Sequence, residues 1–189
     1  MCDGYSGYNK LKKAKRTTCW SHVRRYLLDA IPKGKKMDYT LPAVQGAMYV
    51  DKLFHLEKEI KKQHKNDYES IKAARLEKEV PVLEGFWSWF EKQHAVKGSR
   101  MEKALTYIQN RRSDMMTYLE DGRCSFCNNL SEIEVKPVAL GRKNYLFSDT
   151  TAGADSSAVI YSLVETAKAN GLNMYHYLWY LLEELPRTD

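Results

Sequence analysis

Apolar residues recur every three or four positions from Leu41 to Asp121, and this spacing restricts that stretch to amphipathic helices. The clearest run comprises Val50, Leu53, Phe54, Leu56 and Ile60. A helix places such residues on one stripe, and the stripe must be buried against a neighbouring element. The sequence therefore predicts a body of several packed helices over this part of the chain.

Proline and glycine divide this helical stretch. Pro42 suits the first turn of a helix, and Pro81 predicts a kink or a break just before it. Gly98 followed by Ser99 indicates a stop and a new helix cap, and Gly122 ends the stretch. The pattern thus favours three long helices, the second of them interrupted.

The flanking regions contain fewer regular patterns. The run Arg16–Trp20, with β-branched and aromatic residues, is the only good strand candidate, and Ser21 is suited to cap the helix that follows. Beyond Gly122 we expect a short helix that stops at Pro137, a basic turn over residues 141–144, and two final helices separated by Gly171.

Positive charge is concentrated near one end of the chain. The formal net charge is +6. Ten basic residues lie between Lys10 and Lys36 against Asp29 alone, whereas the remainder is slightly acidic. A cationic segment on a nearly neutral body is typical of proteins that bind a phosphate backbone, although a solvated surface run gives the same pattern.

Several protein classes are excluded by composition. Charged residues interrupt every hydrophobic run, so no segment reaches the ~18 to 20 apolar residues of a membrane helix. The N-terminus lacks the basic start and apolar block of a secretory signal, and four irregularly spaced cysteines do not make a disulfide scaffold. We therefore expect a cytoplasmic protein with reduced thiols and no membrane partner.

Four ordered segments resemble the IS66 family of bacterial insertion-sequence transposases. They are residues 3–9 (DGYSGYN), 19–25 (CWSHVRR), 128–147 (NNLSEIEVKPVALGRKNYLF) and 161–171 (YSLVETAKANG). The first resembles the family's aspartate-bearing loop and the second its following strand-to-helix element. The third resembles the C-terminal signature and the fourth the closing helix, so the resemblance spans essentially the whole chain.

The resemblance implies an α/β, ribonuclease H-like catalytic core in which two aspartates and one glutamate bind two divalent cations, Mg²⁺ or Mn²⁺. By motif, Asp3 is the second aspartate and Glu132 the glutamate, and both are expected to be catalytic residues and metal ligands. The first aspartate is expected upstream of Met1. The chain itself is then a C-terminal portion, inactive alone, mostly α, with one or two short strands and a large helical insertion.

The same resemblance implies a division into three segments and a set of partners. Residues 1–32 are expected to be a partial core with the basic segment, 33–122 the helical insertion, and 123–189 the C-terminal helices. The implied function is DNA transposition in the bacterial cytoplasm, at the nucleoid, with transposon ends and target DNA as partners. A homo-oligomer and helper proteins of the element are further expected partners. The residues expected to contact DNA are Lys10, Lys12, Lys13, Lys15, Arg16, Arg24, Arg25, Lys136, Arg142 and Lys143.

Each catalytic assignment has a structural alternative. An aspartate before Gly-Tyr, such as Asp3, is often a turn residue. Asn129 and Glu132 have the spacing of a capping box, in which the glutamate would bond the start of its own helix. The family context favours the metal role for both carboxylates.

Three residues depart from the family's signature. Cys127 stands where Asp is usual, Ile133 where Arg is usual, and Lys136 where Arg is common. Lysine is a point charge and cannot grip a phosphate with two parallel bonds, so DNA contacts in this helix are expected to be weaker. Decay of the element is one hypothesis, and the alternative function is a non-catalytic helical DNA-binding or interaction remnant.

Two further groups of residues suggest other chemistry. Cys19, His22, Cys124 and Cys127 make up the ligand set of a structural zinc site, but about a hundred residues separate the two pairs, and we consider zinc unlikely. Phe86, Trp87 and Trp89 resemble a base-stacking platform. Their helical spacing favours core or subunit contacts instead.

Overall fold

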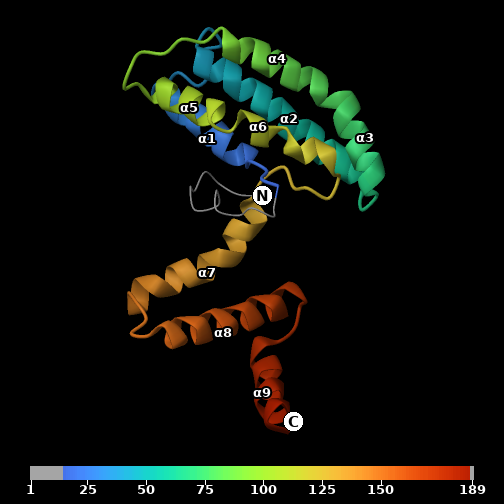
Figure 1. Ribbon diagram of the computed structural model, residues 1–189, viewed down its shortest axis with the longest axis vertical. Helices are drawn as coiled ribbons and strands as arrows, with labels where there is room; N and C mark the ends of the chain where they lie inside the picture. Colours follow the sequence, from blue (N-terminus) through green and yellow to red (C-terminus); the bar gives the residue numbers. More distant parts are fainter. Residues whose placement is uncertain (1–14, 188–189) are drawn as a thin grey trace. The chain divides into compact units, whose positions relative to one another are not determined.

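A computed structural model describes residues 15–187 and contains only helices as regular elements over that range (Figure 1). Side chains of Leu130, Ser131, Glu134, Arg142, Asn144 and Tyr145 lie outside the description. Contacts divide the chain into unit 1, residues 1–128, and unit 2, residues 129–189. No helix within residues 15–187 is long and apolar enough to cross a bilayer.

Unit 1 contains six α-helices and a 3-10 turn among its described residues. They are α1 (Trp20–Ala30), α2 (Pro42–His64), α3 (Tyr68–Lys78), α4 (Val80–Glu91), α5 (Arg100–Gln109), α6 (Arg112–Met115) and η2 (Thr117–Glu120). Helix α1 packs against α2 and α5, while α2 also packs against α3 and α4 (Figure 1). The long helix α2 is therefore the scaffold of this unit, and the predicted helical body is confirmed.

The core of unit 1 is built around aromatic rings. The indole of Trp20 is fully buried, stacks on Phe126 with ring centroids 5.5 Å apart, and meets Phe86 edge-on at 5.6 Å. Its indole N–H donates to the carbonyl of Met115 at 3.3 Å. Trp89 is also buried, which confirms that the aromatic cluster of α4 belongs largely to the core.

Most of the predicted helix boundaries in unit 1 agree with the structure. Pro42 is at the start of α2, and the break predicted at Pro81 separates α3 from α4. The Ser99 hydroxyl accepts from the Glu102 N–H at 3.1 Å, and the Glu102 carboxylate accepts from the Gly98 N–H at 2.5 Å. These reciprocal bonds satisfy N–H groups that the first turn of α5 would otherwise leave open.

The strand predicted for Arg16–Trp20 is wrong, because α1 already begins at Trp20 and the residues described before it form no strand. Ser21 is therefore inside the helix and is not its cap. The Thr18 N–H donates to the Asp114 carbonyl at 3.1 Å, and the Trp20 N–H donates to the Phe126 carbonyl at 3.3 Å. Backbone carbonyls of α6 and of the loop before α7 thus accept the N–H groups of this segment in place of a neighbouring strand.

Two helix predictions also need correction. The helix expected to continue to Asp121 ends at Gln109, and α6 and η2 follow as short separate turns. The stop predicted at Pro137 is wrong, because α7 (Asn129–Tyr145) runs through this proline. The basic turn expected over residues 141–144 is consequently helical.

Unit 2 consists of three α-helices and a terminal turn, α7, α8 (Thr151–Ala169), α9 (Met174–Glu184) and η3 (Leu185–Arg187). Gly171, with φ of +68°, lies between α8 and α9 as predicted. Ala167 is the one fully buried residue among the side chains described in this unit. Many large apolar side chains of unit 2 are exposed, including Phe147, Ile160, Trp179, Tyr180 and Leu182. The three-segment division inferred from the family stays a prediction.

Candidate catalytic and DNA-contact residues

Helix α7 presents the predicted glutamate together with two predicted DNA contacts. Glu132 is in its first turn and is exposed, as are Lys136 and Lys143. Spacings of four and seven residues place all three on one face of a helix. The face thus combines an oxygen ligand suited to a hard divalent cation with two ammonium groups suited to phosphate.

A different face of α7 contacts α8. Val135 and Val138 of α7 and Tyr161 of α8 line an open groove of about 430 Å³ between these two helices. In helical projection Val135 and Val138 lie about 60° and about 120° from Glu132, on the same side. The contact with α8 is therefore centred on a different flank of α7 from the Glu132 carboxylate.

The capping-box alternative for Glu132 does not fit the observed start of the helix. Because α7 begins at Asn129, the cap position is Asn128 and Glu132 is the fourth helical residue. A capping box requires the third. The helix start therefore gives no support to the structural alternative.

Several predicted site residues lie outside the described part of the chain. Asp3, Lys10, Lys12 and Lys13 precede residue 15. Arg142 is a backbone position of α7 whose side chain is not described. The expected pairing of Asp3 with Glu132 thus stays a prediction.

Three of the predicted phosphate contacts are ion-paired within unit 1. Lys15 pairs with Glu120, Arg16 with Asp114 at 3.6 Å, and Arg24 with Asp51 at 2.5 Å. Arg25, by contrast, is exposed and has no carboxylate partner within residues 15–187. The positive potential expected from sequence is therefore partly neutralised at three of these four described positions.

Of the four side chains proposed for zinc, Cys19 and His22 have ligand atoms within 4.8 Å of one another, and neither Cys124 nor Cys127 joins them. Within residues 15–128 no three ligand atoms from His, Cys, Asp or Glu approach closely enough to hold a metal ion. The Cys19 sulfur instead accepts from the Asn128 N–H at 3.1 Å. This contact ties the loop before α7 to the start of α1.

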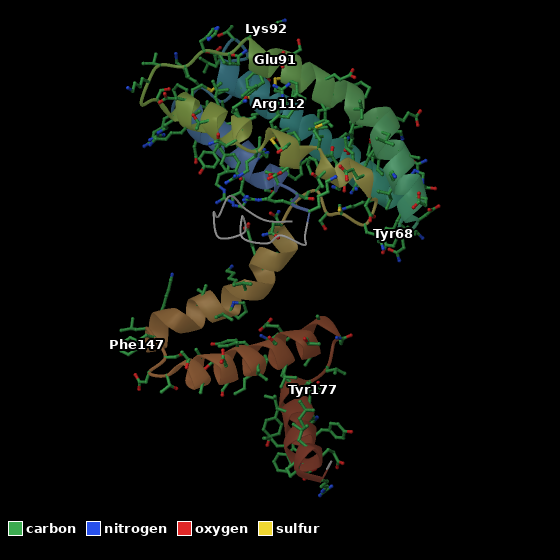
Figure 2. The ribbon with its side chains drawn as sticks, in the orientation of Figure 1. Tyr68, Glu91, Lys92, Arg112, Phe147 and Tyr177 are labelled. Atoms are coloured by element: carbon green, nitrogen blue, oxygen red, sulfur yellow. The ribbon has the colours of Figure 1, made fainter. Side chains whose placement is uncertain are left out.

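The remaining aromatic residue of the α4 cluster contacts a cation. Figure 2 labels Arg112 of α6 and Glu91 of α4, whose side chains pair at 2.8 Å. The Arg112 guanidinium lies 4.7 Å from the ring centre of half-buried Trp87. One face of Trp87 is thus already occupied, which disfavours base stacking on that face.

An ionic cluster in the core of unit 1 was missed by sequence reasoning. Arg75 is fully buried, and its five N–H groups all have acceptors. Two N–H groups donate to the Glu57 carboxylate at 2.9 and 2.6 Å, and the others donate to the carbonyls of Tyr118, Asp121 and Cys124. Arg75 therefore fastens the segment that precedes α7 to helices α2 and α3.

A second acidic residue extends this cluster. Glu79 is fully buried, and the Tyr118 hydroxyl donates to its carboxyl oxygen at 2.6 Å. Burial raises the pKa of Glu79 from 4.5 to about 7, although the Tyr118 hydrogen bond lowers it. Burial also raises the pKa of Tyr118, and the neighbouring carboxyl group of Glu79 adds to the rise.

Glu79 makes the stability of unit 1 depend on pH. Its pKa is higher in the folded chain than in the unfolded chain, so the folded state binds more protons between pH 4.5 and about 7. The free energy of unfolding is expected to fall across this window as pH rises, by at most roughly 3 kcal/mol. Urea unfolding at pH 5 and pH 8 measures the change.

Glu79→Gln is the matched variant for this measurement, because the amide oxygen can still accept from Tyr118 but does not titrate. We expect its pH 5 to pH 8 difference to be smaller than that of the unsubstituted protein. Equal differences in the two proteins would show that Glu79 does not titrate in this window.

Only weak sequence signals pointed to this cluster. Glu57 and Lys61 stand four residues apart, as do Arg75 and Glu79, and such pairs usually lie on a solvated helix face. One available hint was that Glu57 follows Leu56 within the apolar run of α2. The burial of both carboxylates depends on how α2, α3 and η2 pack.

Comparison with known proteins identifies the family. The sequence pattern of the Transposase IS66 family matches residues 1–156, and that of the IS66 C-terminal element matches residues 162–189. No solved structure matches the chain.

Curated relatives in Sinorhizobium fredii are longer proteins. The uncharacterized protein y4qI is 29% identical over 188 residues, which cover 93% of this chain and 34% of the relative. The uncharacterized protein y4jD is 27% identical over 194 residues, or 97% of this chain and 37% of the relative. This chain thus spans about a third of the length of these relatives. With both family patterns matched in order along its length, it belongs to the IS66 family of transposases.

Proposed function

We propose that this chain acts in DNA transposition as the glutamate-bearing C-terminal portion of a metal-dependent transposase. The observation that carries the proposal is the position of Glu132, exposed on α7 within the family's signature, on one face with Lys136 and Lys143. The proposed core is the ribonuclease H-like fold of the intact family. The proposed substrates are transposon ends and target DNA.

The proposed chemistry needs carboxylate oxygens, and among the described residues the Glu132 carboxylate is well suited to this role. Asp3 and Glu132 would hold Mg²⁺ or Mn²⁺ together with a first aspartate supplied upstream. When bound, two such ions activate the attacking oxygen and stabilise the leaving oxygen of a phosphodiester. Lys136 and Lys143 would bind flanking phosphates and hold the DNA against the carboxylate. Two carboxylates without the first aspartate form an incomplete set, so the chain alone is proposed to be inactive.

A non-catalytic DNA-binding role is the second candidate function. The observation in its favour is that unit 1 has its own aromatic core and needs no catalytic residue to hold it together. Both roles require DNA binding, and only the first requires Glu132. Homo-oligomers and helper proteins would be compatible with either role.

Binding of the full chain to duplex DNA tests the feature that both roles share. We expect retardation of duplex DNA at low salt without sequence preference, and a quadruple Lys12, Lys13, Lys15 and Arg16→Ala variant should have a flatter salt dependence. K12A/K13A should lower the salt slope by roughly 1.8. K15A/R16A should lower it less, because Lys15 and Arg16 already pair with carboxylates.

Fluorescence anisotropy over a series of salt concentrations measures these slopes. Equal slopes for the quadruple variant and the unsubstituted chain would refute the assignment of this segment to DNA. Equal effects of the two double variants would show that the ion pairs do not limit phosphate binding.

A further inference from the structure

Helices α1 and α5 meet along an exposed edge that combines tyrosines and cations. Tyr26 of α1 stacks on Tyr107 of α5 with ring centroids 4.5 Å apart and planes inclined by 24°. One turn further along α1, the carbonyl of Asp29 accepts from the Arg100 guanidinium of α5 at 3.3 Å. These two contacts show that α1 and α5 run antiparallel, side by side, as Figure 1 also shows.

Four cations lie along this edge. Arg100 and Lys103 precede Tyr107 on the flank of α5 that faces α1, and Arg111 follows it. The Arg111 guanidinium lies 5.8 Å from the centre of the Tyr107 ring. On α1, Arg25 is exposed beside Tyr26. We call these six residues the α1–α5 edge: Arg25, Tyr26, Arg100, Lys103, Tyr107 and Arg111.

Little negative charge opposes Arg25 and Lys103. Asp29, one helical turn after Arg25, is the acidic residue that α1 contributes beside the edge. On α5, Glu102 is engaged by the Gly98 N–H at the start of the helix. Neither Arg25 nor Lys103 has a carboxylate partner in the part of the chain that the structure describes, residues 15–187. Arg24, by contrast, is neutralised by Asp51.

We propose that the α1–α5 edge binds the sugar-phosphate backbone of DNA, as a contact surface on the helical body separate from the basic segment before residue 15. The proposal rests on the proposed function, because it assumes that the chain works on DNA. Arginine and lysine supply the charge that displaces counterions. The exposed Tyr26 can contact sugars and phosphates through its ring and hydroxyl, whereas the Tyr107 hydroxyl is buried. A row of cations beside partly exposed aromatic rings matches an extended polyanion in charge and in contact chemistry.

The test compares two double variants of the full chain that remove equal charge. R25A/K103A alters the α1–α5 edge, whereas K62A/K78A removes two exposed lysines from α2 and α3. We expect R25A/K103A to weaken binding of a 30-base-pair duplex and to lower the salt slope by roughly 1.8. The control should keep the slope within about 0.5 of that of the unsubstituted chain. Circular dichroism of both variants verifies that the helices are retained.

The possible results separate the inference from the proposed function. Unchanged binding by R25A/K103A, or equal weakening by both variants, would overturn the α1–α5 edge as a binding surface while DNA binding itself persists. Failure of the unsubstituted chain to bind any duplex at low salt would overturn the proposed function together with the edge.

Photo-crosslinking provides a second readout that does not depend on charge. DNA containing 5-bromodeoxyuridine should crosslink to peptides containing Tyr26 or Tyr107, because aromatic side chains near DNA are efficient acceptors of this crosslink. Crosslinks confined to peptides outside residues 25–33 and 100–111 would contradict the proposal.

Discussion

Replacing Arg75 by methionine is expected to lower the free energy of unfolding of unit 1 by about 3–5 kcal/mol. Arg75 is fully buried, and its guanidinium donates to the Glu57 carboxylate and to three backbone carbonyls. Methionine fills similar space but donates nothing, so the carboxylate and carbonyls would remain buried with fewer partners. Lys61, 2.9 Å from Glu57, compensates for only part of the lost charge.

Urea unfolding followed by tryptophan fluorescence measures this effect, because Trp20 and Trp89 lie in the core of unit 1. Arg123→Met is the matched control. Arg123 pairs with Asp121 on the surface of the same segment, with its side chain 74% exposed, and its loss should change the free energy by less than about 1 kcal/mol. Similar losses for the two variants would mean that the buried cluster does not fasten this segment.

Arg75→Lys separates charge from geometry. Lysine retains the positive charge but has three donors on one atom, and it cannot reproduce the planar fork that reaches Glu57 and three carbonyls at once. We expect most of the destabilisation of the methionine variant to remain. Full recovery by lysine would show that charge alone accounts for the cluster.

Local signals predicted the helices of unit 1 well. Pro42, Pro81 and Ser99 set boundaries that the structure confirms, because backbone constraints of proline and capping by serine act within a few residues. Pro137 is the exception. A proline inside a helix removes one hydrogen bond and clashes with the preceding turn, yet α7 continues to Tyr145.

Features that depend on tertiary partners could not be predicted in this way. The Arg16–Trp20 segment has strand-forming residues, but its N–H groups donate to carbonyls of α6 and of a loop, and β propensity is expressed only beside a partner strand. The burial of Arg75 and Glu79 likewise requires three elements to converge. Candidate catalytic residues came from resemblance to the family's motifs, since no local rule separates Glu132 from other exposed glutamates.

Glu132→Gln is expected to have the largest effect on function. In a transposase that carries this chain together with the first aspartate, loss of a carboxylate ligand should slow strand cleavage by roughly 10²–10³-fold, equivalent to about 3–4 kcal/mol. Duplex binding should change little, because the substitution removes no cation. Glu183→Gln, at an exposed position of α9, is the matched control and should leave the cleavage rate unchanged.

A cleavage assay on DNA that carries the ends of the element, run beside anisotropy on the same DNA, separates the two steps. Normal cleavage by the Glu132→Gln protein would exclude this residue as a metal ligand. Loss of cleavage together with loss of DNA binding would point to misfolding or to a role in binding.

The most direct measurement uses a transposase that carries this chain together with the first aspartate. It loads that protein with Fe²⁺ in place of Mg²⁺ and maps where hydroxyl radicals, generated at the bound ion, cut the backbone. If Asp3 and Glu132 hold the same cation, cuts appear near both residues. Excess Mg²⁺ and the Glu132→Gln substitution each suppress both sets of cuts, whereas Glu183→Gln leaves them in place. Cuts near only one of the two carboxylates, or a pattern that Glu132→Gln leaves intact, would contradict the account.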